Sequence, residues 1–136
     1  MPFDLDIVTP HGQAFQGPVD AVQLPGSEGE FGVLPGHERF LTALRIGEVA
    51  IRRGSETLRA AVSDGIAEVH GDAVKVLVET CELAGAIDVA RAEQARSHAA
   101  DAIADLPEPA DPLRLAELEA ALARAQNRLS VASRKD

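Results

Sequence analysis

Polar and apolar residues alternate along the first part of the chain, a pattern typical of strands with one buried face. At the start, Phe3, Leu5 and Ile7 are separated by Asp4 and Asp6. Similar alternation recurs at three further places: Val49 and Ile51; Leu58, Ala60 and Val62; and Val74, Val76 and Val78. Residues 66–70 are predicted as a further short strand. Short strands at close spacing with Gly-rich turns predict an antiparallel β-sandwich or barrel over residues 1–86.

Two of these turns carry recognisable turn chemistry. Asp64-Gly65 lies between two predicted strands and is a strong hairpin signal. Gly54-Ser55 supplies an earlier turn and Gly71-Asp72 a later one.

Residues 87–136 have a different pattern, because glycine is absent and alanine dominates. Asp88 can cap a first helix. The small and apolar residues of that helix recur every three or four positions, at Ala92, Ala95, Ala99, Ala102 and Leu106. Residues 107–112 include three prolines that end the helix, and Asp111-Pro112 is a start signal for a second one. Its apolar stripe is Leu115, Leu118, Leu122, Ala125, Leu129 and Ala132.

These two helices, joined by a short loop, predict an antiparallel C-terminal hairpin. Its first helix offers mainly alanine for packing, and each buried CH₂ contributes only about 0.8 kcal/mol. We therefore expect the hairpin to pack closely but weakly, and to detach from the sandwich at modest cost.

Composition and charge narrow the classes of partner. The formal net charge of -9 argues against nucleic acid, which proteins bind mainly through Lys and Arg. Cys81 is the single cysteine, so the chain cannot form an internal disulfide. We expect neither a signal peptide nor a membrane-spanning segment, since no apolar run approaches about 20 residues.

Candidate catalytic chemistry is sparse. His11, His37, His70 and His98 have no Cys or His partner at metal-ligand spacing, so no metal site is predicted. The sequence contains no nucleotide-binding loop and no nucleophile motif. Glu28 and Glu30 could form a pair of catalytic carboxylates, but a glycine-rich surface loop with solvated charges is the favoured reading of residues 26–32. We therefore predict no catalytic residue and no required cofactor.

Several segments together carry a family resemblance that covers essentially the whole chain. They are FDLDIVTP at residues 3–10, LPGSEGEFGVLPGH at residues 24–37, VSDGIAEV at residues 62–69 and NRLSVA at residues 127–132. These segments resemble the epsilon subunit of bacterial F-type ATP synthases. That resemblance implies an N-terminal β-sandwich followed by a two-helix hairpin, in agreement with the pattern.

The resemblance also implies partners. In that family the sandwich binds the gamma subunit and rests on the ring of c subunits, and the rotor so formed couples proton flow to ATP synthesis at the alpha and beta subunits. By position, Glu28, Glu30 and His37 fall in the segment near the c ring. The implied location is peripheral, at the cytoplasmic face of the bacterial inner membrane, with membrane contact only through the Fo sector.

A regulatory role for the hairpin is implied as well. In this family the hairpin either folds beside the sandwich or extends along gamma, where it impedes ATP hydrolysis. The second helix here is relatively basic, with Arg114, Arg124, Arg128, Arg134 and Lys135. Such a helix can meet an acidic segment of the beta subunit, although a solvated helix face is the plain alternative.

A second implied role is ATP sensing. Residues 87–92, IDVARA, resemble the segment through which some bacterial members bind ATP, so Ile87 and Ala92 complete the matched pattern. By position, Glu82 and Asp88 would face the adenine and ribose, and the phosphates would meet Arg91, Arg124 and Arg128. A further basic position of ATP-binding members is His98 here. The alternative is that Asp88 is only a helix cap and Arg91 a surface residue.

Two rival interpretations of the whole chain stay open. One is a free-standing ATP sensor whose nucleotide binding matters more than its rotor contacts, which nucleotide titration would reveal. The other is an unrelated β-sandwich adaptor with a coiled-coil tail, which failure to co-purify with gamma would favour.

Overall fold

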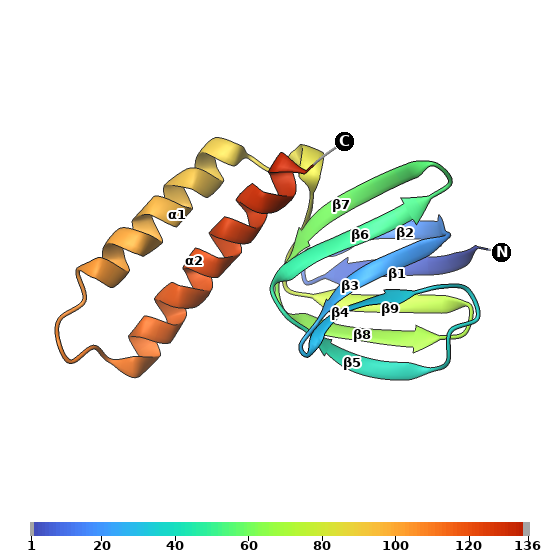
Figure 1. Cartoon of the computed structure of the whole chain (residues 1–136), viewed down its shortest axis with the longest axis horizontal. Coiled ribbons are helices and arrows are strands. Elements are labelled where there is room, and N and C mark those ends of the chain that lie inside the picture. Colours follow the sequence, from blue (N-terminus) through green and yellow to red (C-terminus); the bar gives the residue numbers. More distant parts are fainter. Residues whose placement is uncertain (1, 135–136) are drawn as a thin grey trace.

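Ten strands and a helical hairpin make up the computed structural model, which describes residues 2–134 (Figure 1). The strands are β1 (Phe3–Thr9), β2 (Gly12–Val19), β3 (Ala21–Gly26), β4 (Gly29–Val33), β5 (Phe40–Leu44), β6 (Gly47–Arg53), β7 (Glu56–Val62), β8 (Gly65–His70), β9 (Ala73–Val78) and β10 (Cys81–Leu83). A short 3₁₀ turn, η1 (Ala84–Ala86), leads to α1 (Val89–Ala104) and α2 (Pro112–Ser133).

The strands form one continuous sheet in the order β10-β7-β6-β3-β5-β8-β9-β1-β2, and β4 pairs with β3 outside this path. β3 joins β5 through the single residue pair Gly26 and Leu44, where the sheet turns over on itself. The two halves of the sheet then face each other, and their inward side chains form one core. The predicted sandwich followed by a two-helix hairpin is therefore confirmed.

One strand pairing departs from the predicted antiparallel arrangement. β1 lies parallel to β9, with Leu5 opposite Val74 and Ile7 opposite Val76. Alternation reports which face of a strand is buried, but it carries no information about the direction of the neighbouring strand. The parallel pair joins the first strand to a strand about 70 residues later.

The core confirms the alternating positions from which the strands were predicted. Leu5, Ile7, Val49, Ile51 and Val76 are all fully buried within it. Full burial of such a side chain contributes about 1.5–3 kcal/mol, so this core is the main source of the sandwich's stability.

Residues 26–32, predicted as a glycine-rich surface loop, instead form most of a β-hairpin. Gly26 pairs with Gly29 and Pro25 with Glu30, so β3 and β4 are joined by a turn at Ser27 and Glu28. Gly29 has a φ of 133°, a conformation that side-chain-bearing residues rarely adopt. The glycines thus permit a tight turn in a segment where alternation is hard to see.

Both helix caps follow the predicted chemistry. The Asp88 carboxylate accepts a hydrogen bond from the Arg91 N–H at 3.1 Å, and that of Asp111 accepts one from Leu113 at 3.0 Å. Pro112 occupies the first turn of α2, where a missing N–H costs nothing. α1 ends at Ala104, two residues before Leu106, ahead of the first proline.

The hairpin meets the sandwich through one end of α2. Near its C-terminus, α2 packs on β6, β7 and η1, and the rest of the hairpin projects away from the strands (Figure 1). A small apolar cluster lies at this contact, separate from the main core: Ala61, Ala84, Ile87, Val131 and Ala132. In the part of the chain that the structure describes, neither helix is long and apolar enough to cross a membrane.

A candidate regulatory cleft and two contact surfaces

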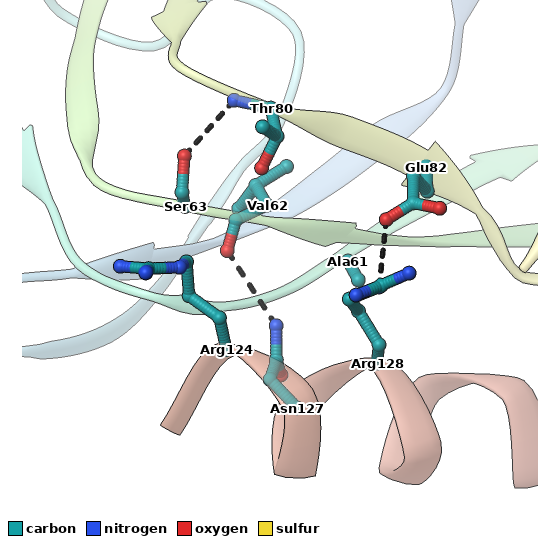
Figure 2. Close-up of a pocket in the computed structure, with 8 residues that line it drawn as sticks. All are labelled: Ala61, Val62, Ser63, Thr80, Glu82, Arg124, Asn127 and Arg128. Atoms are coloured by element: carbon teal, nitrogen blue, oxygen red, sulfur yellow. Dashed lines mark hydrogen bonds and ion pairs between the residues drawn. The ribbon is translucent and has the colours of Figure 1, made fainter. Parts of the chain in front are cut away.

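A small cleft opens where α2 leaves the sandwich (Figure 2). The sandwich contributes Ala61, Val62, Ser63, Thr80 and Glu82, and α2 contributes Arg124, Asn127 and Arg128. The three α2 residues lie one turn apart or less on one face of the helix, as i, i+3 and i+4 neighbours do. The cleft encloses about 140 Å³.

Asn127 fastens the middle of this face to the sheet. Its Nδ2 donates to the carbonyl of Gly47 at 2.8 Å and lies 3.5 Å from that of Val62. These carbonyls belong to the first residue of β6 and the last residue of β7. The amide thus joins α2 to the ends of two paired strands.

Glu82 and Arg128 form an ion pair across the cleft (Figure 2). Nε of Arg128 lies 2.9 Å from Oε1 of Glu82, but its N–H is not aligned as a hydrogen bond. The Arg128 side chain is 24 % exposed and that of Glu82 is 35 % exposed, so the pair is partly shielded from water. Arg124 lies on the other side of Asn127 and has no ion pair among residues 2–134 (Figure 2).

The cleft brings together three of the seven residues predicted to bind ATP, namely Glu82, Arg124 and Arg128. The other four residues do not line it. Ile87 belongs to the apolar cluster, Asp88 caps α1, Arg91 is exposed on α1, and Ala92 is buried. Ligand pockets usually enclose about 300–1,000 Å³, so this cleft must widen before it can hold a nucleotide.

Cys81, close to the cleft on β10, has the properties of a structural thiol. Burial, with a smaller contribution from the neighbouring Glu82 carboxylate, raises the pKa of the thiol to about 11. Since the thiolate is the reactive form, this cysteine is a poor nucleophile near neutral pH.

The residues predicted to contact a c ring lie along one hairpin and the segment after it. Glu28 is exposed in the β3–β4 turn, and Glu30 is exposed on β4, 3.5 Å from the Gln23 amide. His37 follows β4, and its ring lies 5.0 Å from that of Phe40. Glu28 and His37 therefore lie at opposite ends of β4, and all three side chains can reach a partner.

A second surface could not be found from local patterns alone. Ala43, Ile66, Leu77 and Val8 are cross-strand neighbours on β5, β8, β9 and β1. We call them the outer apolar row. Ile66 and Leu77 are 42 % and 41 % exposed, and Leu41 beside them is 64 % exposed. Each residue is unremarkable in its own strand, and only the register of the four strands aligns them.

The structure also reveals polar residues that the sequence did not single out. Asn127, Glu48 and Arg59 all lie where the hairpin meets the sandwich. Arg134, predicted only as part of a basic helix, contacts Glu48, while Lys135 lies outside the described residues. Across residues 2–134, no group of three or more His, Cys, Asp or Glu side chains is placed to hold a metal ion.

Two domain families match the chain end to end. The beta-sandwich domain of the ATP synthase delta/epsilon chain matches residues 2–84. The long alpha-helix domain of the same chain matches residues 86–133.

Curated relatives agree with these matches. The chain is 45 % identical over 130 residues to ATP synthase epsilon chain 2 of Syntrophotalea carbinolica, covering 96 % of this chain and 93 % of the relative. It is 42 % identical to the epsilon chain of Geotalea uraniireducens, with the same coverage. It is 43 % identical to that of Dehalococcoides mccartyi strain CBDB1 over 131 residues, covering 96 % and 92 %.

Solved structures share the fold at lower identity. A chain of the Euglena gracilis mitochondrial ATP synthase (OSCP/F1/c-ring) superposes with a TM-score of 0.81 at 24 % identity, covering 97 % of this chain and 81 % of that one. A chain of the Tetrahymena thermophila central stalk and c ring gives a TM-score of 0.68 at 13 % identity, covering 97 % of both chains.

Proposed function

This chain belongs to the ATP synthase delta/epsilon family, and from that premise we propose that it is a rotor component of the F1 central stalk. Its sandwich binds gamma and rests on the c ring, so that c-ring rotation is coupled to ATP synthesis at the alpha and beta subunits. Like the epsilon chains that it matches, it is a non-catalytic subunit and not an enzyme. Its proposed role depends on contacts with other subunits and not on a reaction that it catalyses.

The observation that carries the gamma contact is the outer apolar row. Apolar side chains on adjacent strands, exposed together, mark an interaction surface more often than scattered ones do. Ala43, Ile66, Leu77 and Val8 lie in register, flanked by Leu41. An apolar strip across four strands suits a large, permanent protein partner.

The c-ring contact rests on the β3–β4 hairpin and the segment after it. Glu28, Glu30 and His37 present polar groups suited to the loops of a membrane-embedded ring. Through that ring the chain is held peripherally at the cytoplasmic face of the inner membrane, and it touches the membrane only through the Fo sector.

The hairpin supplies the regulatory part of the proposal. The contact of α2 with β6, β7 and η1, which we call the seat, is small, so the hairpin can leave it and extend towards the catalytic hexamer. Arg114, Arg124 and Arg128 on α2 would then face an acidic partner and impede ATP hydrolysis. Association between oppositely charged surfaces is favoured in both rate and orientation.

ATP sensing is the second candidate function, favoured by the presence of Arg124, Arg128 and Glu82 in one cleft. Guanidinium groups bind phosphate oxygens well. A nucleotide in a widened cleft would bridge α2 and β10 and so hold the hairpin folded. ATP is then a regulatory ligand and not a required cofactor.

The gamma contact is tested by titrating the cognate gamma subunit with a Leu77→Glu variant. A buried, unpaired carboxylate is costly, so we expect the affinity to fall at least about tenfold. The matched control is Leu83→Glu, which places the same charge at an exposed apolar position on β10. Equal affinities for both variants would remove the outer apolar row as the gamma surface.

Calorimetric titration of the isolated chain with ATP tests the second function. We expect binding in the millimolar range or tighter, weakened by Arg124→Gln. Asp88→Ser tests the Asp88 carboxylate separately, because serine keeps the helix cap while removing that carboxylate. If no heat is evolved up to several millimolar ATP, the nucleotide role is excluded and the rotor role is untouched.

A further inference from the structure

One carboxylate at the seat of the hairpin is shared between two arginines. Oε2 of Glu48 lies 3.1 Å from a guanidinium nitrogen of Arg59 and 3.4 Å from one of Arg134. Glu48 and Arg59 belong to adjacent strands, β6 and β7, whereas Arg134 is the C-cap residue directly after α2. One arginine therefore stays with the sandwich if the hairpin moves, and the other leaves.

The side chain of Glu48 is largely enclosed, with only 13 % of its surface exposed. Its Oε1 is buried without a hydrogen-bond partner among the described residues, and Nε of Arg59 is in the same condition. A charge in this position is strongly destabilising when its only partner is removed. Because Arg59 remains beside Glu48, departure of Arg134 does not leave the carboxylate unpaired.

The remaining contacts at the seat do not change this difference between Arg59 and Arg134. Arg128 pairs with Glu82, whose side chain is 35 % exposed and is readily hydrated on release. Asn127 gives up neutral hydrogen bonds to the Gly47 and Val62 carbonyls. Both ion pairs across the seat have the same polarity, with carboxylates on the sandwich and guanidiniums on α2.

We propose that Glu48, Arg59 and Arg134 form a reversible charge latch that holds the hairpin against the sandwich. Arg134 closes the latch, and Arg59 lowers the cost of opening it in two ways. It compensates the Glu48 charge after release, and before release it repels the Arg134 guanidinium. The latch extends the proposed regulatory role of the hairpin, but it is a property of the isolated chain.

The latch makes an unusual prediction, namely that the two arginines on one carboxylate have opposite effects. Loss of Arg134 should loosen the hairpin, because an ion pair disappears. Loss of Arg59 should hold the hairpin more tightly, because the repulsion disappears and opening then leaves the Glu48 carboxylate without a charged partner. An ordinary structural salt bridge predicts loosening or no change from both.

The experiment measures the opening of the hairpin by thiol labelling. Ala84 is 6 % exposed and lies on η1 in the cluster that the hairpin covers, and it is not cross-strand from Glu48 as Ala61 is. An Ala84→Cys reporter in a Cys81→Ala background would react with an uncharged disulfide reagent mainly in the open state. When closing is fast, the labelling rate follows the open population.

We expect Arg134→Gln and Glu48→Gln to raise the labelling rate about two- to fivefold, the range of partly exposed ion pairs. Arg59→Gln should lower it, and Arg59→Lys, which keeps the charge, should leave it nearly unchanged. Arg114→Gln is the matched control, since it removes the same charge from α2 at a residue whose one ion pair among residues 2–134 is with Glu117. Salt should accelerate labelling of the parent more than of Arg134→Gln.

Two results would overturn the latch. One is equal labelling of Arg134→Gln and Arg114→Gln. The other is faster labelling of Arg59→Gln while the thermal midpoint of its sandwich is unchanged. If that midpoint falls instead, the Arg134→Gln, Glu48→Gln and salt comparisons still decide the question. None of these results bears on gamma binding, which is measured separately.

Discussion

At the scale of single residues, the sandwich depends on a few positions where no other side chain fits. Gly65 begins β8 opposite the end of β9, and a Cβ placed there would lie 1.9 Å from the Leu77 carbonyl oxygen. Because that neighbour is backbone, it cannot rotate away. The residue that the sequence marks as a turn signal is thus required for close strand approach.

Replacing Gly65 with alanine should therefore be costly. Overpacking of this kind typically costs about 1–3 kcal/mol, and we expect the free energy of unfolding in urea to fall by at least about 2 kcal/mol. Gly71→Ala is the control, because a Cβ at that position meets nothing within 4 Å. Similar stabilities for the two variants would show that β8 and β9 are not this close.

The Cys81 thiol makes the stability of the folded chain depend on pH in the alkaline range. Its pKa is about 11 in the folded chain, against an ordinary value of 9.0. The folded state therefore binds the proton more tightly than the unfolded state, and the stability gained is complete below pH 9. As pH rises from about 9 to 11, the free energy of unfolding should fall more in the parent than in Cys81→Ala. Parallel curves for the two proteins would contradict the pKa shift.

At the scale of elements, the packing inside the sandwich differs from the packing of the hairpin on the sandwich. The sandwich core is built from side chains of the size of valine and leucine, whereas the seat of the hairpin buries Ala61, Ala84 and Ala132 with Ile87 and Val131. Small side chains remove little apolar area from water. We therefore expect the hairpin to be the part of the molecule that opens most readily.

Hydrogen exchange measures this difference directly. We expect amides of α1 to exchange at least about tenfold faster than those of β6 and β9, because α1 reaches the sandwich mainly through α2. Asp88→Ala should accelerate exchange of α1 further, since loss of a cap costs about 1 kcal/mol. Asp88→Ser should not. Protection of α1 equal to that of the strands would show a rigidly docked hairpin.

A comparison of the elements shows which parts of the fold could be predicted from the sequence alone. Both helices were predictable, because Asp88 and Asp111 are caps and the apolar spacing is regular. Alternation likewise predicts the buried faces of β1, β6, β7 and β9, and residues 66–70 were predicted as a strand without an assigned face. It misses β2, where Gly17 and Pro18 interrupt the pattern on an edge strand, and it also misses the β3–β4 hairpin, β5 and β10.

The candidate sites were only partly predictable, for a related reason. Family resemblance selected Glu82, Arg124 and Arg128, which the fold brings to one cleft. The outer apolar row depends on strand register, which no single strand encodes. The pairing of Glu48 with Arg134 joins residues 86 positions apart, so its existence follows only from where α2 is seated.

At the scale of the whole molecule, the sandwich and the hairpin have separate proposed tasks. The sandwich has its own core, to which none of the helix residues that the structure describes contributes, and it presents the proposed gamma and c-ring surfaces. The hairpin is attached by a small seat and carries the basic residues proposed to act on the catalytic hexamer. A rotor part that must stay bound while its regulatory arm moves requires this division.

The most direct test of the account is the ATPase rate of the cognate F1 core lacking this subunit, titrated with the full chain and with a chain truncated after Ala86. We predict that both chains bind, because the truncated chain keeps the core of the sandwich. Only the full chain should suppress ATP hydrolysis. Binding of both chains with suppression by neither would contradict the regulatory role of the hairpin, and failure of both to bind would contradict the assignment to the rotor.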